Sequence, residues 1–204
     1  MADARSEILG RIRRSLADRP AQPEVPRDYD LTRPVSQLPA LFAERAEDYR
    51  ATVHAVSAHQ VPSVIRELLA ARGAETMVGP PDLPASWLVD GVKWRLDDPP
   101  LSVAELDAAD GVLTGCALAI AETGTIVLDA GMEQGRRALT LVPDYHLCVV
   151  LADQVVGTVP EAIAALDPVR PLTFISGPSA TSDIELNRVE GVHGPRTLEL
   201  LLVT

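Results

Sequence analysis

The stretch Leu172-Thr-Phe-Ile-Ser-Gly-Pro-Ser-Ala-Thr-Ser-Asp-Ile-Glu185 joins a short apolar run to a dense polar cluster. The run 172–175 predicts a strand, and a second run, 198–203, predicts another strand after Gly191-Val-His-Gly-Pro195. Hydroxyls, carboxylates and one imidazole are therefore concentrated between two strands. Because α/β proteins usually bind ligands at the carboxyl ends of their strands, this stretch predicts both a fold class and the position of a site.

The segments that precede this stretch alternate between strand-like and helix-like apolar patterns. We expect strands at 52–57, 75–78, 112–113, 117–121, 125–129 and 147–151, and helices at 38–50, 61–72, 102–108, 133–141 and 160–166. The pair Asp90-Gly91 separates the apolar runs 87–89 and 92–96, which is typical of a hairpin. This alternation predicts an α/β sheet with helices on its faces.

The N-terminal segment has a different pattern from the rest of the chain. Apolar residues recur at helical spacing over 4–17, with arginines on the other face, and five prolines follow within 19–39. We therefore divide the chain into a helix with a proline-rich linker, 1–37, and an α/β domain, 38–204. The helix could pack on its own domain or on another subunit, and the sequence leaves both possibilities open.

The composition limits the function. The formal net charge is −11, and residues 1–33 carry seven arginines against six acids, so the acidity lies in the remainder. A protein of this charge is not expected to bind nucleic acid in general, because such binding needs a basic face. The apolar runs are too short to span a membrane, and the N-terminus lacks the apolar core of a signal peptide, so we expect a cytoplasmic protein.

The two cysteines, Cys116 and Cys148, lie far apart within apolar segments. We expect buried free thiols, not a disulfide or a metal site. Two thiolates also cannot ligate an ordinary four-thiolate iron–sulfur cluster, so any such cluster would belong to a partner. The histidines lack metal-site spacing, and the dinucleotide and phosphate-loop motifs are absent from the sequence, which disfavours zinc, NAD(P) and ATP sites.

A first candidate site is Ala121-Glu-Thr-Gly-Thr125, which lies between two apolar runs. Gly124 lets the backbone turn, while Thr123 and Thr125 add hydroxyls. One interpretation makes Glu122 a general base, a nucleophile or a carboxylate that orients a ligand. The other is an exposed turn in which Glu122 only keeps the surface polar.

The second candidate site is the polar cluster itself. Ser179 and Thr181 offer hydroxyls beside backbone N–H groups that could hold an anion. Ser182-x-x-Glu185 also has the form of a capping box, which would give those two residues a structural role. Asp183 is not explained by that cap and is a candidate acid–base carboxylate.

Two histidines are further candidates near the polar cluster. His193, between Val192 and Gly194-Pro195, is either an acid–base group or a turn residue bonded to backbone. His146, at the start of an expected strand, is either a second pocket residue or a polar group at a strand edge.

Four segments together resemble the lactate-utilization protein C family, the LUD-domain group. They are Ala119-Ile-Ala-Glu-Thr-Gly-Thr125, the segment 137–143 leading to His146, Ser176-Gly-Pro-Ser-x-Thr-x-Asp-Ile-Glu185, and Gly191-Val-His-Gly-Pro195. The resemblance covers about residues 38–204 and includes the N-terminal helix in outline. Four motifs in order make it more specific than any one of them.

The resemblance implies an α/β fold similar to the NagB/RpiA/CoA-transferase class, with an open, mostly parallel sheet and helices on both faces. It also implies a role in an iron–sulfur system that oxidises L-lactate to pyruvate. The clusters of that system lie on sister proteins, so these would be the partners and this chain would bind no cofactor of its own. Family members often carry a basic residue where this chain has Ala180, and Arg136, Arg137, Arg188 or Arg196 could substitute for it.

Three functions remain open at this point. The first, which we favour, is an accessory component that binds a small ligand or iron–sulfur partners; it could also be a homo-oligomer. The second is a free-standing enzyme that acts on a small acyl or sugar-phosphate substrate through Glu122, an analogy at the level of fold alone. The third is a regulatory or scaffolding protein. We expect the catalytic residues to be Glu122, Asp183 and His193, and the ligand-binding residues to be Thr123, Gly124, Thr125, Ser179, Thr181 and Glu185.

Overall fold

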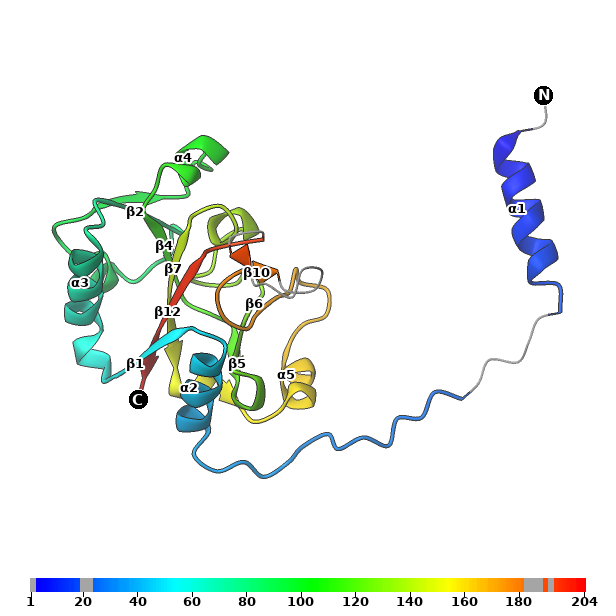
Figure 1. The fold of residues 1–204 in the computed structure, drawn as a ribbon, viewed down its shortest axis with the longest axis horizontal. Helices are drawn as coiled ribbons and strands as arrows, with labels where there is room; N and C mark the ends of the chain where they lie inside the picture. The colour runs from blue at the N-terminus through cyan, green and yellow to red at the C-terminus, as the bar shows by residue number, and fades with distance from the viewer. Residues whose placement is uncertain (1–2, 19–23, 182–188, 191–192) are drawn as a thin grey trace. The chain divides into compact units, whose positions relative to one another are not determined.

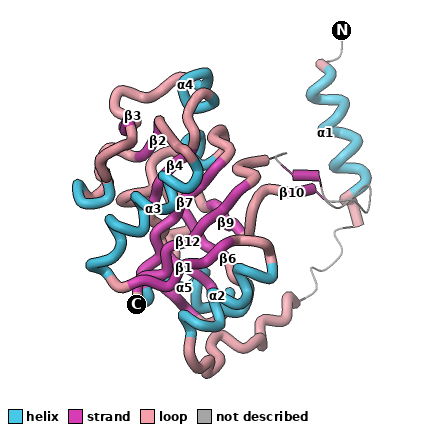
Figure 2. The backbone as a smooth tube through the Cα atoms, turned by 60° about the vertical axis from the view of Figure 1, so that its left-hand side comes forward, coloured by secondary structure: helices cyan, strands magenta, loops and turns pink. Residues whose placement is uncertain are grey.

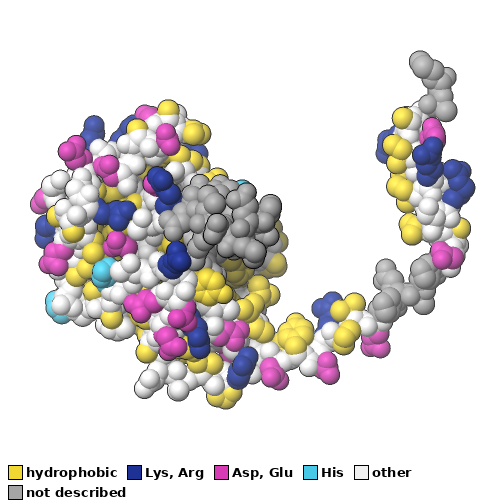
Figure 3. All heavy atoms as spheres, in the orientation of Figure 1, with side chains coloured by type: hydrophobic (Ala, Val, Ile, Leu, Met, Phe, Trp, Pro, Cys, Tyr) yellow, Lys and Arg dark blue, Asp and Glu magenta, His cyan; other side chains and the backbone are white. Residues whose placement is uncertain are grey.

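The computed structural model describes residues 3–18, 24–181, 189–190 and 193–204. The chain divides into two compact units, Met1–Asp30 and Leu31–Thr204. The first contains helix α1 (Ala4–Ser15), where the Asp3 carboxylate accepts a hydrogen bond from the Arg5 N–H at 3.1 Å. Apolar side chains lie along one side of α1 and arginines along the other (Figure 3). The apolar residues Ile8, Leu9, Ile12 and Leu16 are exposed.

The second unit is built on a six-stranded sheet in the order β1-β12-β7-β4-β2-β3. Its strands are β1 (Thr52–Val56), β12 (Thr197–Val203), β7 (Tyr145–Leu151), β4 (Gly111–Thr114), β2 (Thr76–Gly79) and β3 (Lys93–Leu96). Every ladder in this sheet is parallel. The expected α/β class with an open, mostly parallel sheet is therefore confirmed.

A second sheet of four strands lies against one face of the first, in the order β8-β5-β6-β9. Its strands are β8 (Val155–Val156), β5 (Leu118–Ile120), β6 (Thr125–Leu128) and β9 (Thr173–Ile175). The β5–β6 and β6–β9 ladders are antiparallel. Figure 2 shows β6 and β9 side by side. The sequence predicts most of these strands but not their separation into a second sheet.

Helices cover both faces of the main sheet (Figure 1). α3 (Val61–Arg72) packs on one face through Ile65 and Leu69. α2 (Leu38–Asp48) and α4 (Val103–Asp107) pack on the other face, beside the second sheet. α5 (Val159–Ala165) covers the outer side of the second sheet through Ala162.

Several local expectations are confirmed. Gly73 ends α3 in the left-handed conformation with φ +67°, as a C-terminal glycine should. The capping box of Ser102 and Glu105 begins α4. Cys116 and Cys148 are buried and free.

Two local expectations are wrong. Asp90-Gly91 makes no hairpin, because β3 pairs with β2 in parallel and Trp87 closes a 3-10 turn, Ala85–Trp87. The expected helix 133–141 is only a 3-10 turn, η4 (Arg137–Thr140). Its first half cannot be helical because Glu133 and Gly135 have positive φ values of +62° and +68°.

Two glycines fit closely against the last turn of α2. Gly124 has φ +58°, and a Cβ there would overlap the backbone of Arg45 and Ala46. Gly177 has φ +89°, and a Cβ there would overlap the carbonyl oxygen of Tyr49. One helix end therefore holds two loops that belong to different strands of the second sheet.

The contact between Gly177 and Tyr49 predicts that Gly177→Ala is far more destabilising than Gly91→Ala. Gly91 has nearly the same φ, +91°, but apart from its two chain neighbours no described residue has an atom within 4 Å of where its Cβ would be, so its substitution carries only backbone strain. We expect Gly91→Ala to lower the free energy of unfolding by about 1 kcal/mol. Gly177→Ala should lower it by about 3 kcal/mol, since a steric clash is added. Equal losses in urea unfolding would contradict the contact.

Candidate ligand-binding site

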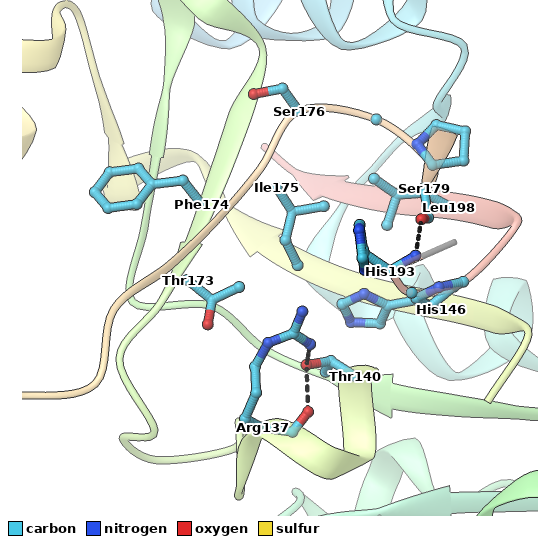
Figure 4. A pocket seen from close by; sticks show the side chains of 14 residues that line it. Arg137, Thr140, His146, Thr173, Phe174, Ile175, Ser176, Ser179, His193 and Leu198 are labelled. Carbon is cyan, nitrogen blue, oxygen red and sulfur yellow. Dashed lines mark hydrogen bonds between the residues drawn. The ribbon is translucent and has the colours of Figure 1, made fainter. Parts of the chain in front are cut away.

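A cavity of about 240 Å³ opens between the two sheets (Figure 4). His146 and Leu198 line it from the first residues of β7 and β12, and β9 lines the opposite side. Loops 176–179 and 193–195 complete its wall. The cavity therefore lies at the amino ends of β7 and β12 and at the carboxyl end of β9, so the expected position at the carboxyl ends of strands applies to β9 and not to the main sheet.

His146 is a buried histidine, only 1% exposed, at the wall of this cavity. Its Nε2 lies 2.7 Å from the Oγ1 of Thr114, which is itself fully buried on β4. Either atom can be the donor, depending on the tautomer of the imidazole. The bond restrains the ring, so His146 is a pocket residue and not an exposed polar group at a strand edge.

Two hydrogen bonds join Ser179 of the polar cluster to the turn that contains His193. The His193 N–H donates to the Oγ of Ser179 at 2.9 Å, and the Ser179 N–H donates to the Pro195 carbonyl at 2.8 Å. His193 is thus fixed through its backbone, while its exposed side chain still lines the cavity. Both interpretations of this histidine are compatible with that arrangement.

Arg137 extends from η4 into the cavity (Figure 4). Its NH1 donates to the Oγ1 of Thr140 at 3.1 Å, and no carboxylate of the described residues pairs with it. Burial lowers the pKa of the Arg137 guanidinium below its usual value, although an arginine stays protonated in proteins. Arg137 is nevertheless exposed overall, so its guanidinium keeps contact with water, and among the described residues it has no anionic partner.

The other arginines that could replace the missing basic residue at Ala180 are placed differently. Arg136 pairs with Asp97 at 2.6 Å and also bonds the Leu101 carbonyl. Arg196 pairs with Asp144, its Nε lying 2.7 Å from Oδ1. Arg188 lies outside the described residues. Of these four arginines, Arg137 is the one that the structure places on the cavity.

The two candidate stretches of the sequence meet through hydroxyl groups. The Oγ1 of Thr125 lies 2.7 Å from the Oγ1 of Thr123 and 2.7 Å from the Oγ of Ser176. Thr125 is buried, whereas Ser176 is exposed and lines the cavity. Thr123 and Thr125 therefore support the cavity wall through Ser176 and do not line it themselves.

Glu122 lies apart from the cavity. Its Oε1 accepts a hydrogen bond from the Val159 N–H at 3.0 Å, at the first residue of α5. Its Oε2 pairs with Arg33 at 3.3 Å. This is the arrangement of a carboxylate that stabilises a helix N-terminus, and Gly124 serves the contact with α2.

The remaining expected residues are only partly described. Thr181 belongs to β10 (Ala180–Thr181), which pairs with β11 (Val189–Glu190) in an antiparallel ladder. Asp183, Glu185 and the capping box 182–185 lie outside the described residues. Of the nine residues that we named, the structure places Ser179 and His193 on the cavity.

The expected site residues did not include Arg137, Thr140 and His146, which also line the cavity. The sequence had offered two signals, because we considered His146 as a second pocket residue and Arg137 as a substitute for the basic residue missing at Ala180, but we selected neither as a site residue. Among residues 3–18, 24–181, 189–190 and 193–204 no cluster of metal-ligating side chains is found, and no helix there is long and apolar enough to cross a bilayer.

The structure thus combines an open α/β sheet with a smaller sheet, and a cavity lined by Arg137 lies between them. The LUD domain model matches residues 40–203, so the chain belongs to the LUD domain family. It is 49% identical over 208 residues to lactate utilization protein C of Deinococcus radiodurans, covering 99% of this chain and 96% of that protein.

A more distant relative is lactate utilization protein C of Geobacillus kaustophilus, 30% identical over 167 residues, covering 71% of this chain and 69% of that protein. The fold is similar to the crystal structure of a DUF162 family protein from Deinococcus radiodurans, with a TM-score of 0.72 and 44% identity. That match covers 84% of this chain and 100% of the other.

The ion pair between Arg136 and Asp97 predicts that the free energy of unfolding depends on pH. Burial alone would raise the pKa of Asp97, but Arg136 and the Leu101 N–H lower it below the ordinary value. Because the folded pKa is the lower one, this stabilisation is present above the unfolded pKa of about 3.9 and is lost as the pH falls through the folded pKa. We expect Asp97→Asn to cost about 2 kcal/mol at pH 7 and less at pH 3, which lies below the unfolded pKa.

Asp48→Asn is the control for that measurement, because the Asp48–Arg45 pair is exposed. Its effect on unfolding should stay below about 1 kcal/mol at either pH. Thermal unfolding of both variants at the two pH values tests the prediction. A loss for Asp97→Asn that does not change between pH 7 and pH 3 would show that the carboxylate's ionisation is not what stabilises the fold.

Proposed function

We propose that this chain works in lactate utilization and binds a small monocarboxylate, L-lactate or pyruvate, in the cavity between its two sheets. Its relatives from Deinococcus radiodurans and Geobacillus kaustophilus carry the name lactate utilization protein C, and the similarity to the first extends over nearly the whole chain. A free acid of this size matches a cavity of about 240 Å³ better than a nucleotide or a polymer does.

The observation that carries the proposal is the position of Arg137. Its guanidinium faces the cavity, and the described residues supply no carboxylate to neutralise it. A bound carboxylate would supply the anionic partner that this guanidinium lacks among the described residues. The planar guanidinium also matches a carboxylate with two parallel hydrogen bonds, which is the preferred geometry of this pair.

Two imidazoles give the proposed site its acid–base chemistry. His146, restrained by Thr114, is suited to accept or donate a hydrogen bond at the 2-hydroxyl or 2-oxo oxygen of the ligand. His193 and Ser179 would contact the ligand from the opposite loops. Oxidation of lactate to pyruvate releases two electrons and two protons; the imidazoles can take up protons, but the electrons need a redox partner.

We therefore assign the redox step to iron–sulfur partner proteins and make this chain an accessory component, in the cytoplasm. The two cysteines support this, because both are buried in the core, where they cannot reach a cluster at the surface. A tagged chain should co-purify iron–sulfur proteins from lactate-grown cells, and a strain without it should grow poorly on lactate but normally on glucose. Normal growth on lactate with no co-purified partner would contradict the assignment.

The alternative, a free-standing enzyme with Glu122 as nucleophile, has less support. Both carboxylate oxygens of Glu122 already have partners, and the residue does not lie on the cavity. A nucleophilic carboxylate needs a substrate within bonding distance. We retain Glu122 as a structural residue in this proposal.

Neighbouring arginines provide the test of the ligand site. Arg137→Met should weaken L-lactate binding about 30-fold in calorimetric titration, because hydrogen bonds to a charged group contribute about 2 kcal/mol. The same substitution should leave thermal unfolding nearly unchanged, since no ion pair within the described residues is lost.

Arg136→Met is the matched control one residue away. It should keep the affinity for L-lactate within about two-fold but lower the unfolding temperature, because it removes the arginine that pairs with Asp97. If instead Arg137→Met binds L-lactate as well as the wild type, Arg137 is not the carboxylate site and the proposal loses its basis.

A further inference from the structure

A second cavity, of about 290 Å³, adjoins the first at Arg137, Thr140 and Thr173. Its other lining residues come from the end of β6, the turn before η4 and the segment before β9. They are Leu128, Ala130, Gln134, Gly135, Pro171 and Leu172. Arg137 thus stands at the junction of two cavities, where one guanidinium can serve a ligand that extends into both.

The second cavity is mainly apolar. The amide of Gln134 is buried and already accepts a hydrogen bond from the Asp129 N–H at 2.6 Å. The nearby charges are also satisfied, because Arg170 pairs with Asp129 at 2.6 Å. Among the lining residues that the structure describes, Arg137 is the single charged one. Apart from Arg137, Thr140, Thr173 and Gln134, the lining residues are apolar, and this part of the surface suits a hydrocarbon group.

Size distinguishes this cavity pair from a site for lactate alone. Cavities of about 300–1,000 Å³ typically hold ligands of drug size. The two cavities together reach that range, whereas lactate has one methyl group to place beyond its carboxylate and hydroxyl. A methyl group would leave most of the second cavity without a ligand contact.

We infer that the second cavity receives the side chain of a 2-hydroxy or 2-oxo monocarboxylate longer than that of lactate. The inference rests on the proposed function, since it places the ligand carboxylate on Arg137 and its oxygen at C2 toward His146. The alkyl group then lies against Pro171 and Leu172. The ligand class is therefore 2-hydroxy acids with an aliphatic side chain of several carbons, with lactate as the shortest member.

A homologous series of acids tests this inference on the full-length protein. Calorimetric titration would compare L-lactate, L-2-hydroxybutyrate and L-2-hydroxy-4-methylpentanoate. Affinity should rise about four-fold for each added methylene that enters the apolar cavity. Two variants that add bulk to the lining of the second cavity, Ala130→Leu and Leu172→Phe, should abolish this gain, so that each variant binds the longer acids no better than it binds L-lactate.

Ala164→Leu is the control, because it adds the same bulk at an exposed position of α5. This variant should keep the higher affinity for the longer acids. Thermal unfolding identifies any variant that fails to fold, and two filling variants guard against that outcome. Equal or weaker binding of the longer acids, with L-lactate still bound, would overturn the inference and leave the proposed function intact. Binding of none of the acids would overturn both.

Discussion

The fit of two left-handed glycines against the end of α2 is the constraint on which the site depends. Gly124 and Gly177 belong to loops that adjoin different strands, and neither position can hold a Cβ because the backbone of Arg45–Ala46 and of Tyr49 already occupies that space. With both loops held there, the Oγ1 of Thr125 lies 2.7 Å from the Oγ of Ser176. Because the end of α2 fixes both loops, the wall of the cavity has a defined position.

The adjacent residues Arg136 and Arg137 differ in their electrostatic surroundings. Arg136 is anchored by Asp97, whose side chain is 6% exposed, and this ion pair holds the start of η4. Arg137, the next residue, lines the cavity, and no acid among the described residues neutralises it. A chain with net charge −11 thus presents a cation in this cavity, and the surrounding loops supply hydroxyl and imidazole groups, as the proposed binding of a small acid requires.

Sequence patterns predicted much of the fold but less of the site. Apolar spacing and end signals located α2, α3, α4 and most strands, because burial and capping are local properties. The second sheet escaped prediction, since an apolar run such as 118–120 does not reveal which strand it will pair with. Glu133 has no residue-level signal for its positive φ, so the helix at 133–141 was an error. Arg136 and Arg137 are the same residue type, so the sequence cannot show which of them forms a structural ion pair and which is a candidate ligand group. Their contacts in the structure distinguish the two roles.

A crystal structure of the protein with bound L-lactate would show whether Arg137 holds the ligand. We expect the ligand's carboxylate to lie within hydrogen-bonding distance of the Arg137 guanidinium, in the cavity that His146 and His193 line, with Gly177 still in contact with Tyr49. Lactate bound elsewhere, for example beside Glu122, with the Arg137 cavity free of it, would contradict a ligand site at Arg137.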